Sequence, residues 1–246
     1  MRVWELEPGR LMVAGAFSDL APHHHPAVQI TVGGHGPLSV TGDGDTHDTC
    51  RLVVIASGAR HAVRSDSDSG ALTLYLGLQT PQGSALNTLA RNHARGVWIV
   101  SGGTQLAEAT AAELAETGPE TAAGFLLDSL CGTQDGRRSV HPQLRQAIEV
   151  VAGRVPERID VASVAGAVAL SPDYLGRLCK QQTGVSFSAA IRWERLVAAI
   201  SYLLDGRSIT DAAHLAGFAD GSHANRVCWE MTGATPSELA EAVNKP

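Results

Sequence analysis

Three histidines near the amino terminus have the types and spacing of a metal-ion site. His23 and His25 are separated by one residue, Gln29 follows four residues later, and His61 comes from a later segment. On an extended strand, His23 and His25 point to the same side, and His61 would approach from a neighbouring strand. Imidazole nitrogens so arranged suit Zn, Ni, Cu or Fe, with Gln29 as a weak fourth donor. In the alternative interpretation, these histidines hydrogen-bond one another or a carboxylate effector.

Two arginines occupy equivalent places in a segment that nearly repeats itself 49 residues later. Residues 174–184 read YLGRLCKQQTG and residues 223–233 read HANRVCWEMTG, so Arg177 matches Arg226 and each copy ends in Thr-Gly. A guanidinium fork can bind guanine through two hydrogen bonds or clamp a phosphate. The alternative is that one arginine forms a structural ion pair. We expect at least one of them to contact DNA.

Other polar residues beside these arginines are second-rank candidates for DNA contact. Asparagine pairs with adenine, aspartate accepts from cytosine, and serine or histidine can take phosphate or base edges. For Asp173, capping of a helix start is an equally good explanation. The candidate set is Ser171, Asp173, Ser222, His223 and Asn225.

The elements that would position these side chains are two pairs of short helices. Apolar residues recur at helical spacing in 161–170 and again in 209–218, just before each repeat copy. Ser171 followed by Pro172 predicts a second helix running to about residue 182, with Gly184 ending it. In the second copy Asp220 or Ser222 is the expected cap. Short helix, tight turn and second helix together predict a helix-turn-helix in each copy.

A single long helix is expected between the two copies. Residues 186–204 contain no Gly or Pro and place apolar side chains near helical period. At a rise of 1.5 Å per residue this helix is roughly 28 Å long, close to the roughly 34 Å between successive major-groove segments on one face of B-DNA. One chain could therefore reach two adjacent grooves.

The region from about 141 to 242 resembles the DNA-binding region of the AraC/XylS family of bacterial transcription regulators. The likeness rests on LSPDYLGRL at 170–178, TGVSF at 183–187, AGF at 216–218 and TG-A-TPS at 232–237. Cys179, Ala224 and Cys228 depart from the family pattern, because phenylalanine is usual there. Gly176 and Gly221 leave two groove-facing positions without a side chain, so base reading would rest on fewer residues.

The amino-terminal part predicts a β domain. Short apolar runs at 11–16, 28–32, 38–41, 52–55 and 71–78 alternate with clusters of Gly, Pro and Asp, which is typical of a sandwich or barrel. The segments 23–32 and 57–61 resemble the two motif regions of a small cupin barrel, with Gln29 where metal-binding cupins usually have Glu. AraC-type regulators often carry such a barrel as a sensor.

The resulting fold class is multidomain β + α: an amino-terminal cupin-like β-barrel with accessory helices and an all-α double helix-turn-helix domain. Residues 85–94, 105–115 and 121–130 are expected to be helical, either as a dimer contact or packed on the barrel. The polar stretch 133–139 is the best linker candidate. We therefore expect an effector-binding and dimerisation domain over 1–135 and a DNA-binding domain over 136–246.

Composition agrees with an intracellular regulator. The net charge of −6 is uneven, because residues 1–135 carry 7 basic and 14 acidic side chains and the remainder 12 and 11. We expect a local basic stripe and weak non-specific DNA binding. No signal peptide or membrane segment is recognisable, and Cys50, Cys131, Cys179 and Cys228 show no CxxC pairing, which fits reduced thiols in a cytoplasm. Cys179 and Cys228 could form a redox switch, but buried helix faces favour inert thiols.

These observations predict a cytoplasmic, dimeric, sequence-specific transcription regulator rather than an enzyme. Its partners would be promoter DNA, RNA polymerase and a small effector, and the resemblance implies activation as the usual output. No cofactor is certain, and a divalent transition metal at His23, His25, Gln29 and His61 is the candidate. Two alternatives remain: a metal-dependent cupin oxidising enzyme with a DNA-binding tail, and a regulator in which the same metal is sensed.

Overall fold

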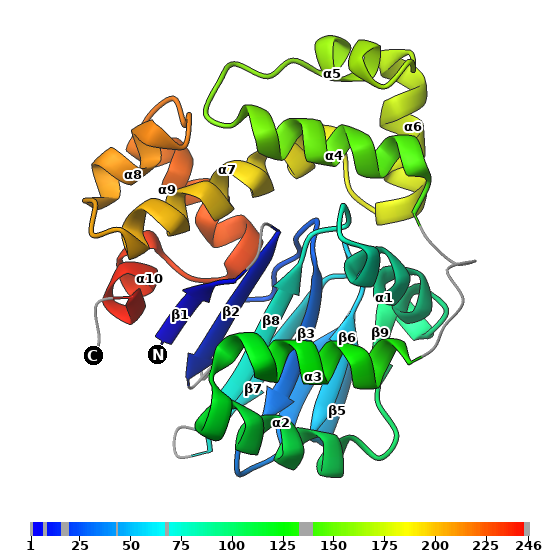
Figure 1. Ribbon diagram of the computed structural model, residues 1–246, viewed down its shortest axis with the longest axis vertical. Helices are drawn as coiled ribbons and strands as arrows, with labels where there is room; N and C mark the ends of the chain where they lie inside the picture. Colours follow the sequence, from blue (N-terminus) through cyan, green and yellow to red (C-terminus); the bar gives the residue numbers. More distant parts are fainter. Residues whose placement is uncertain are drawn as a thin grey trace.

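The computed structural model describes residues 2–6, 9–15, 20–42, 44–66, 69–132 and 140–243, with side chains to 240. The carboxyl-terminal helices lie across one end of the β region, and further helices lie across one face of the sheet (Figure 1). The expected linker at 133–139 falls outside the described residues. No helix in the described ranges is long and apolar enough to cross a bilayer.

The larger sheet has six antiparallel strands in the order β1-β2-β8-β3-β6-β9. Its two faces differ because side chains alternate along each strand. The paired residues Ile30 and Leu74 belong to a core shared with helices, whereas the paired threonines Thr31 and Thr73 face the other way and hydrogen-bond each other. Its strands are β1 (Arg2–Glu5), β2 (Arg10–Gly15), β3 (Val28–Gly33), β6 (Leu52–Ile55), β8 (Ala71–Leu76) and β9 (Val97–Ile99).

A second, three-stranded sheet packs on that other face. Its order is β5-β4-β7, formed by β5 (Asp45–Cys50), β4 (Leu38–Gly42) and β7 (His61–Ser65). Val40 and Val63 pair within it and pack with Val53 of the larger sheet. The predicted β domain is thus two antiparallel sheets with a core between them, and an isolated bridge between His23 and His61 extends β7.

Three helices cover the outer face of the larger sheet. They are α1 (Pro81–Arg91), α2 (Gly103–Thr117) and α3 (Pro119–Cys131), and a 3-10 turn (Ala94–Gly96) leads into β9. Thr80 caps α1 by accepting from the Gly83 N–H, and Gly118 with Pro119 separates α2 from α3. The three helices expected from the sequence are present: α2 and α3 are longer than expected at both ends, whereas α1 begins four residues earlier and ends three residues earlier than expected. The strand β9 between α1 and α2 was not expected.

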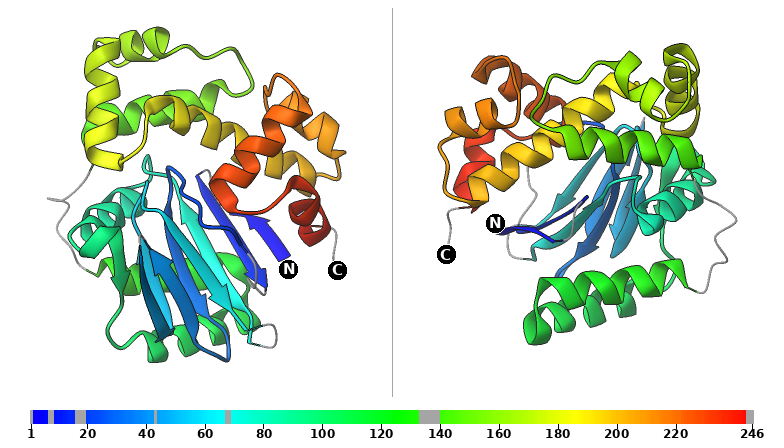
Figure 2. Two further views of the ribbon diagram at one scale, coloured as in Figure 1. Left: turned by 180° about the vertical axis from the view of Figure 1, so that it is seen from behind. Right: turned by 45° about the horizontal axis from the view of Figure 1, so that its top comes forward.

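The carboxyl-terminal region is all helix. Figures 1 and 2 show α7 running across the middle of this layer, with α4–α6 at one end and α8–α10 at the other. The helices are α4 (Pro142–Arg154), α5 (Val161–Ala167), α6 (Pro172–Thr183), α7 (Phe187–Leu204), α8 (Ile209–Leu215), α9 (Gly221–Thr232) and α10 (Pro236–Val243).

The two ends of this helical layer join different cores of the β region. Apolar residues of α4–α6, such as Leu144 and Leu175, belong to the same cluster as the helix-facing side of the larger sheet. Residues of α7–α9, such as Leu196 and Val227, belong to the cluster between the sheets. Each helix-turn-helix unit is therefore anchored separately on the β region.

Candidate DNA-binding and effector sites

The two helix-turn-helix units are built alike. Ser171 caps α6 by accepting from the Tyr174 N–H at 3.2 Å, and Asp220 caps α9 by accepting from the His223 N–H at 2.7 Å. The cap of α9 is therefore Asp220 and not Ser222. Both helices end at a glycine in the left-handed conformation, Gly184 and Gly233.

Arg177 on α6 and Arg226 on α9 are both exposed. Within the described part of the chain, neither guanidinium takes part in an ion pair or a side-chain hydrogen bond. The alternative in which one of them is locked in a structural ion pair is thus not what the structure has. Both fork-shaped donors are available to a ligand from outside.

The second-rank candidates lie near these arginines with different exposure. Asp173, Ser222 and Asn225 are exposed, as is the capping residue Ser171. His223 is half-buried, and its ring stands edge-on to Phe218 with 5.4 Å between centroids. His223 therefore supports the turn of its own unit, and its role as a DNA reader is the weakest of the set.

Other basic residues of this region have partners inside the protein. Arg192 of α7 forms an ion pair with Glu230 of α9 at 3.2 Å, and the Lys180 ammonium donates to the Gly184 carbonyl at 2.7 Å. These contacts hold the second unit on α7 and close the end of α6.

His23, His25, Gln29 and His61 come together between the sheets. His25 lies just before β3 and His61 begins β7, while His23 is bridged to His61 by two backbone hydrogen bonds of 2.9 Å. The expectation of one strand carrying His23 and His25 is wrong in detail, because His25 lies outside any strand, yet one ring nitrogen from each of the three histidines lies within 4.8 Å of the others.

Hydrogen bonds fix the orientation of each imidazole. In all three, Nδ1 faces a backbone carbonyl: Ala21 at 2.9 Å for His23, Ala27 at 3.0 Å for His25 and Ala59 at 2.8 Å for His61. The Gln29 side-chain oxygen lies 3.0 Å from His25 Nε2 and 2.9 Å from His61 Nε2. The Gln29 amide nitrogen donates to the Thr31 hydroxyl at 2.9 Å, which in turn meets Thr73.

The cluster is buried and neutral. His23, His25 and His61 are 3%, 1% and 1% exposed. Burial lowers the pKa of His25 to about 3. The pKa of His61 is held well below its usual value, mainly by burial and to a smaller extent by repulsion from the neighbouring histidines. The imidazoles are therefore uncharged at neutral pH, which is the protonation state that a metal ion requires.

A family model and two known regulatory proteins each match part of this chain. A family model described as a helix-turn-helix domain matches residues 164–242. The arabinose operon regulatory protein of Escherichia coli is 34% identical over 107 residues, which is 41% of this chain and 37% of that protein. The transcriptional regulatory protein YesN of Bacillus subtilis, itself uncharacterized, is 39% identical over 73 residues, 28% of this chain and 20% of its own.

The match supports a helix-turn-helix domain over residues 164–242, and part of the chain is similar to these two regulatory proteins. The chain spans well under half the length of these curated relatives. Among solved structures, ToxT from Vibrio cholerae O395 superposes with a TM-score of 0.65 at 12% identity, covering 97% of this chain and 99% of that one. ToxT from strain SCE256 with an unsaturated fatty acid bound gives 0.66 at 15% identity, covering 98% of each chain. These superpositions show a shared fold.

Departures from the AraC/XylS pattern lie in the cores of both units. Cys179 and Cys228 are buried at equivalent places, and their thiols donate to the Val185 and Ala234 carbonyls at 3.5 Å and 3.2 Å. Burial raises the pKa of both thiols, that of Cys228 to about 12. They are free, protonated thiols in packed surroundings, which fits the inert interpretation rather than a redox switch.

Helix α7 carries two buried side chains whose importance the sequence did not indicate. The Trp193 ring lies 5.2 Å from His25 and 5.8 Å from Tyr75 between centroids. Glu194 is 7% exposed and hydrogen-bonds Gln79, and burial raises its pKa to about 8. The sequence feature that could have indicated them is the adjacent aromatic and acidic residue on an otherwise apolar face of α7. Both lie where α7 contacts the β region.

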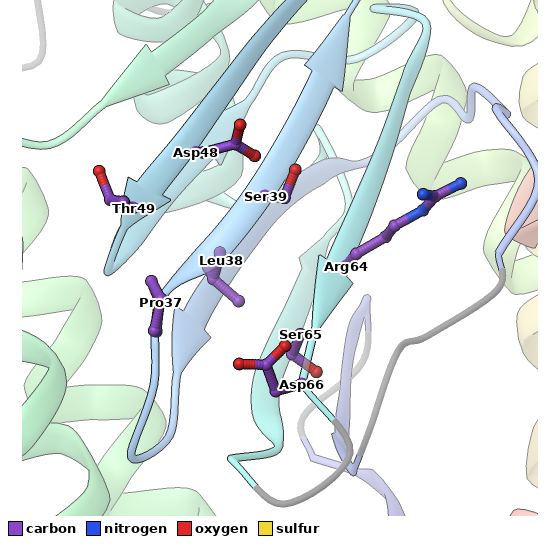
Figure 3. A pocket seen from close by; sticks show the side chains of 8 residues that line it. All are labelled: Pro37, Leu38, Ser39, Asp48, Thr49, Arg64, Ser65 and Asp66. Atoms are coloured by element: carbon purple, nitrogen blue, oxygen red, sulfur yellow. The ribbon is translucent and has the colours of Figure 1, made fainter.

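A separate open hollow of about 510 Å³ lies on the three-stranded sheet. Figure 3 shows Ser39, Asp48 and Arg64 on its three strands, with Arg64 pointing away from Asp48. Its side chains do not converge on a common point, so the histidine cluster is the better candidate for effector binding.

Proposed function

We propose that the protein is a sequence-specific transcription regulator whose two helix-turn-helix units bind adjacent major grooves of promoter DNA. One observation carries the proposal: Arg177 and Arg226 are exposed at equivalent places on α6 and α9, at opposite ends of one helix (Figure 1). The 18 residues of α7 are about 27 Å long, near the pitch of the duplex.

The amino-terminal region, residues 1–135 as inferred from the sequence, is proposed to bind a small effector at the histidine cluster. Effector occupancy would alter how the β region holds residues 136–246 and so change DNA affinity. Homodimerisation through the helices α2 and α3, and contact with RNA polymerase, are proposed from the resemblance to AraC/XylS regulators.

Burial of the cluster favours sensing over catalysis. An oxidising enzyme needs its substrate to reach the metal, whereas the three histidines are at most 3% exposed. A sensed ligand needs only to be bound and held. The rival prediction of a metal-dependent cupin enzyme is therefore the weaker one.

The test is DNA binding to the region upstream of the chain's own coding sequence. Arg177→Ala and Arg226→Ala should each weaken specific binding by about 1–3 kcal/mol if the residue reads a base, and should reduce the salt slope by about one if it clamps a phosphate. Arg64→Ala, which removes an exposed arginine from the β region, is the matched control and should have no effect. Unchanged affinity in both recognition-helix variants would refute the proposal.

A further inference from the structure

We propose that His23, His25 and His61 bind a divalent transition metal ion of the zinc, cobalt or nickel type, and that this ion ties together the two loops on which the two helix-turn-helix units dock. The coupling half of this inference rests on the function proposed above. The binding half stands on the cluster alone.

The first argument is the proton position on each ring. A backbone carbonyl only accepts, so each Nδ1 that faces one must carry the proton, and each Nε2 then offers a lone pair. Metal-bound histidines are characteristically held in this way, with the second nitrogen donating to a carbonyl or carboxylate. Three separate backbone carbonyls enforce the same tautomer here.

The second argument is that protein atoms alone do not satisfy these lone pairs. The Gln29 side-chain oxygen faces two nitrogens that cannot donate to it. If the amide were reversed, its two N–H groups would serve His25 and His61, and His23 Nε2 would still be a buried atom without a partner among the described residues. A cation satisfies all three nitrogens and also the Gln29 oxygen as it lies.

In the structure the Gln29 amide turns its oxygen, the atom that suits a cation, toward the imidazoles. Its amide nitrogen donates to the Thr31 hydroxyl, which hydrogen-bonds the Thr73 hydroxyl on the neighbouring strand. Three neutral nitrogens and one amide oxygen form a donor set that zinc and similar ions accept.

Binding an ion would draw the three rings closer together. One ring nitrogen from each histidine lies within 4.8 Å of the others. Two ligands at the usual 2.0–2.1 Å from one ion in a tetrahedral site are about 3.4 Å apart. The His23 side chain, whose Nε2 has no hydrogen-bond partner among the described residues, is the one expected to move.

The two loops that supply the ligands are also the two docking points of the DNA-binding units. Gly58, close before His61, lies so near the end of α6 that an added Cβ would come 2.6 Å from the Thr183 carbonyl. Gly233, which ends α9, lies so near the other loop that its Cβ would come 2.6 Å from the Ala21 carbonyl and 3.0 Å from His23 Nδ1.

These docking points are equivalent in the repeat, since Thr183-Gly184 corresponds to Thr232-Gly233. The α6 end is further held by the Asn87 amide, which donates to the Gln182 carbonyl at 3.1 Å and accepts from the Ser57 N–H at 3.0 Å. An ion bound by His23 and His25 ahead of β3 and by His61 at the start of β7 would therefore fix the separation of the two recognition helices.

The binding half is tested on the full-length protein after chelator treatment, with Co²⁺ alone as a spectroscopic probe. Stoichiometric visible absorption of a four-coordinate site is expected, displaced by Zn²⁺. His61→Ala should weaken binding at least about 100-fold, whereas His24→Ala, the half-buried neighbour between two ligands, should bind as the wild type does.

A gain-of-affinity variant keeps the test informative if His61→Ala misfolds. Gln29→Glu places a carboxylate where the amide oxygen now lies and should bind Co²⁺ more tightly, by about tenfold or more. Absence of the absorption band in wild type, or an equal band in wild type and in a folded His61→Ala protein, would overturn the metal site.

The coupling half is read by hydrogen exchange without DNA. At a free Zn²⁺ concentration of 100 times Kd, opening that releases the ion should be suppressed by up to about 100-fold, so amides in 181–184 and 231–234 should exchange more slowly. If amide exchange slowed only around the histidines and was unchanged at both helix ends, the coupling would be refuted but the metal site would not. Failure of DNA binding would instead refute the proposed function.

Discussion

The indole of Trp193 packs on the imidazole of His25, with ring centroids 5.2 Å apart and the planes tilted by 33°. This contact joins the middle of the helix that connects the two DNA-binding units to the candidate effector cluster. Tyr75 completes the group, edge-on to His25 at 5.2 Å. A movement of the His25 ring would therefore act directly on α7 through Trp193.

Trp193→Ala should be among the most damaging single substitutions in α7. The side chain is 4% exposed, and removal of a buried tryptophan costs about 3–5 kcal/mol. Chemical denaturation should show this loss in the free energy of unfolding. Trp229→Ala, at 49% exposure, is the matched control and should change stability by no more than about 0.5 kcal/mol. Similar losses in both variants would contradict the packing assigned to Trp193.

Glu194→Gln should stabilise the protein in a pH-dependent way. The pKa of Glu194 is raised to about 8 in the folded protein from an ordinary value of 4.5, so the native state holds a proton that the unfolded state releases. Stability attributable to this group therefore falls as pH rises from about 4.5 to about 8.

The glutamine variant lacks this titration. Its advantage over wild type should be small at pH 5 and reach a few kcal/mol at pH 8 and above. Unfolding free energies measured across this range check the sign. An advantage that is the same at pH 5 and at pH 8 would show that Glu194 is ionised in the folded protein.

Gly58→Ala should weaken the contact between the β region and the end of α6. Its φ of 75° and the 2.6 Å approach to Thr183 both disfavour a side chain, and the combined cost is about 2–4 kcal/mol. Gly102→Ala is a close control, because its φ of 72° is similar but nothing lies within 4 Å. Only the first variant should accelerate hydrogen exchange near residues 182–184; equal acceleration in both would make backbone strain the whole effect.

Thiol labelling should separate the four cysteines. Cys131 is half-exposed, whereas Cys50, Cys179 and Cys228 are buried. A disulfide-exchange reagent should label Cys131 first in native protein and reach Cys179 and Cys228 only when the protein unfolds. Fast labelling of either recognition-helix thiol in folded protein would reopen the redox interpretation.

The carboxyl-terminal region could be predicted closely from the sequence because its signals are local. Ser171 with Pro172 predicts where α6 begins, and Gly184 predicts where it ends. Both predicted ends lie within one or two residues of the observed helix. The exposure of Arg177 and Arg226 follows from the same periodicity. The choice of Asp220 over Ser222 as cap did not follow, because both are good capping residues.

The β region was harder because its contacts are non-local. Strands such as β5, exposed over most of its length, have no apolar alternation to detect. The histidine cluster was anticipated from residue types, but its environment was not. That Trp193 would close it from another part of the chain depends on how the helical layer packs against the sheets, which no local pattern encodes.

The bridge between His23 and His61 has a consequence for the operator. These two backbone hydrogen bonds join the two segments that lie against the ends of α6 and α9. Under the proposed function, a relative that binds half-sites at another spacing would have to alter this bridge or the length of α7, even if its base-contacting side chains were identical. Half-site spacing would then depend on the effector-binding region as well as on the DNA-binding helices.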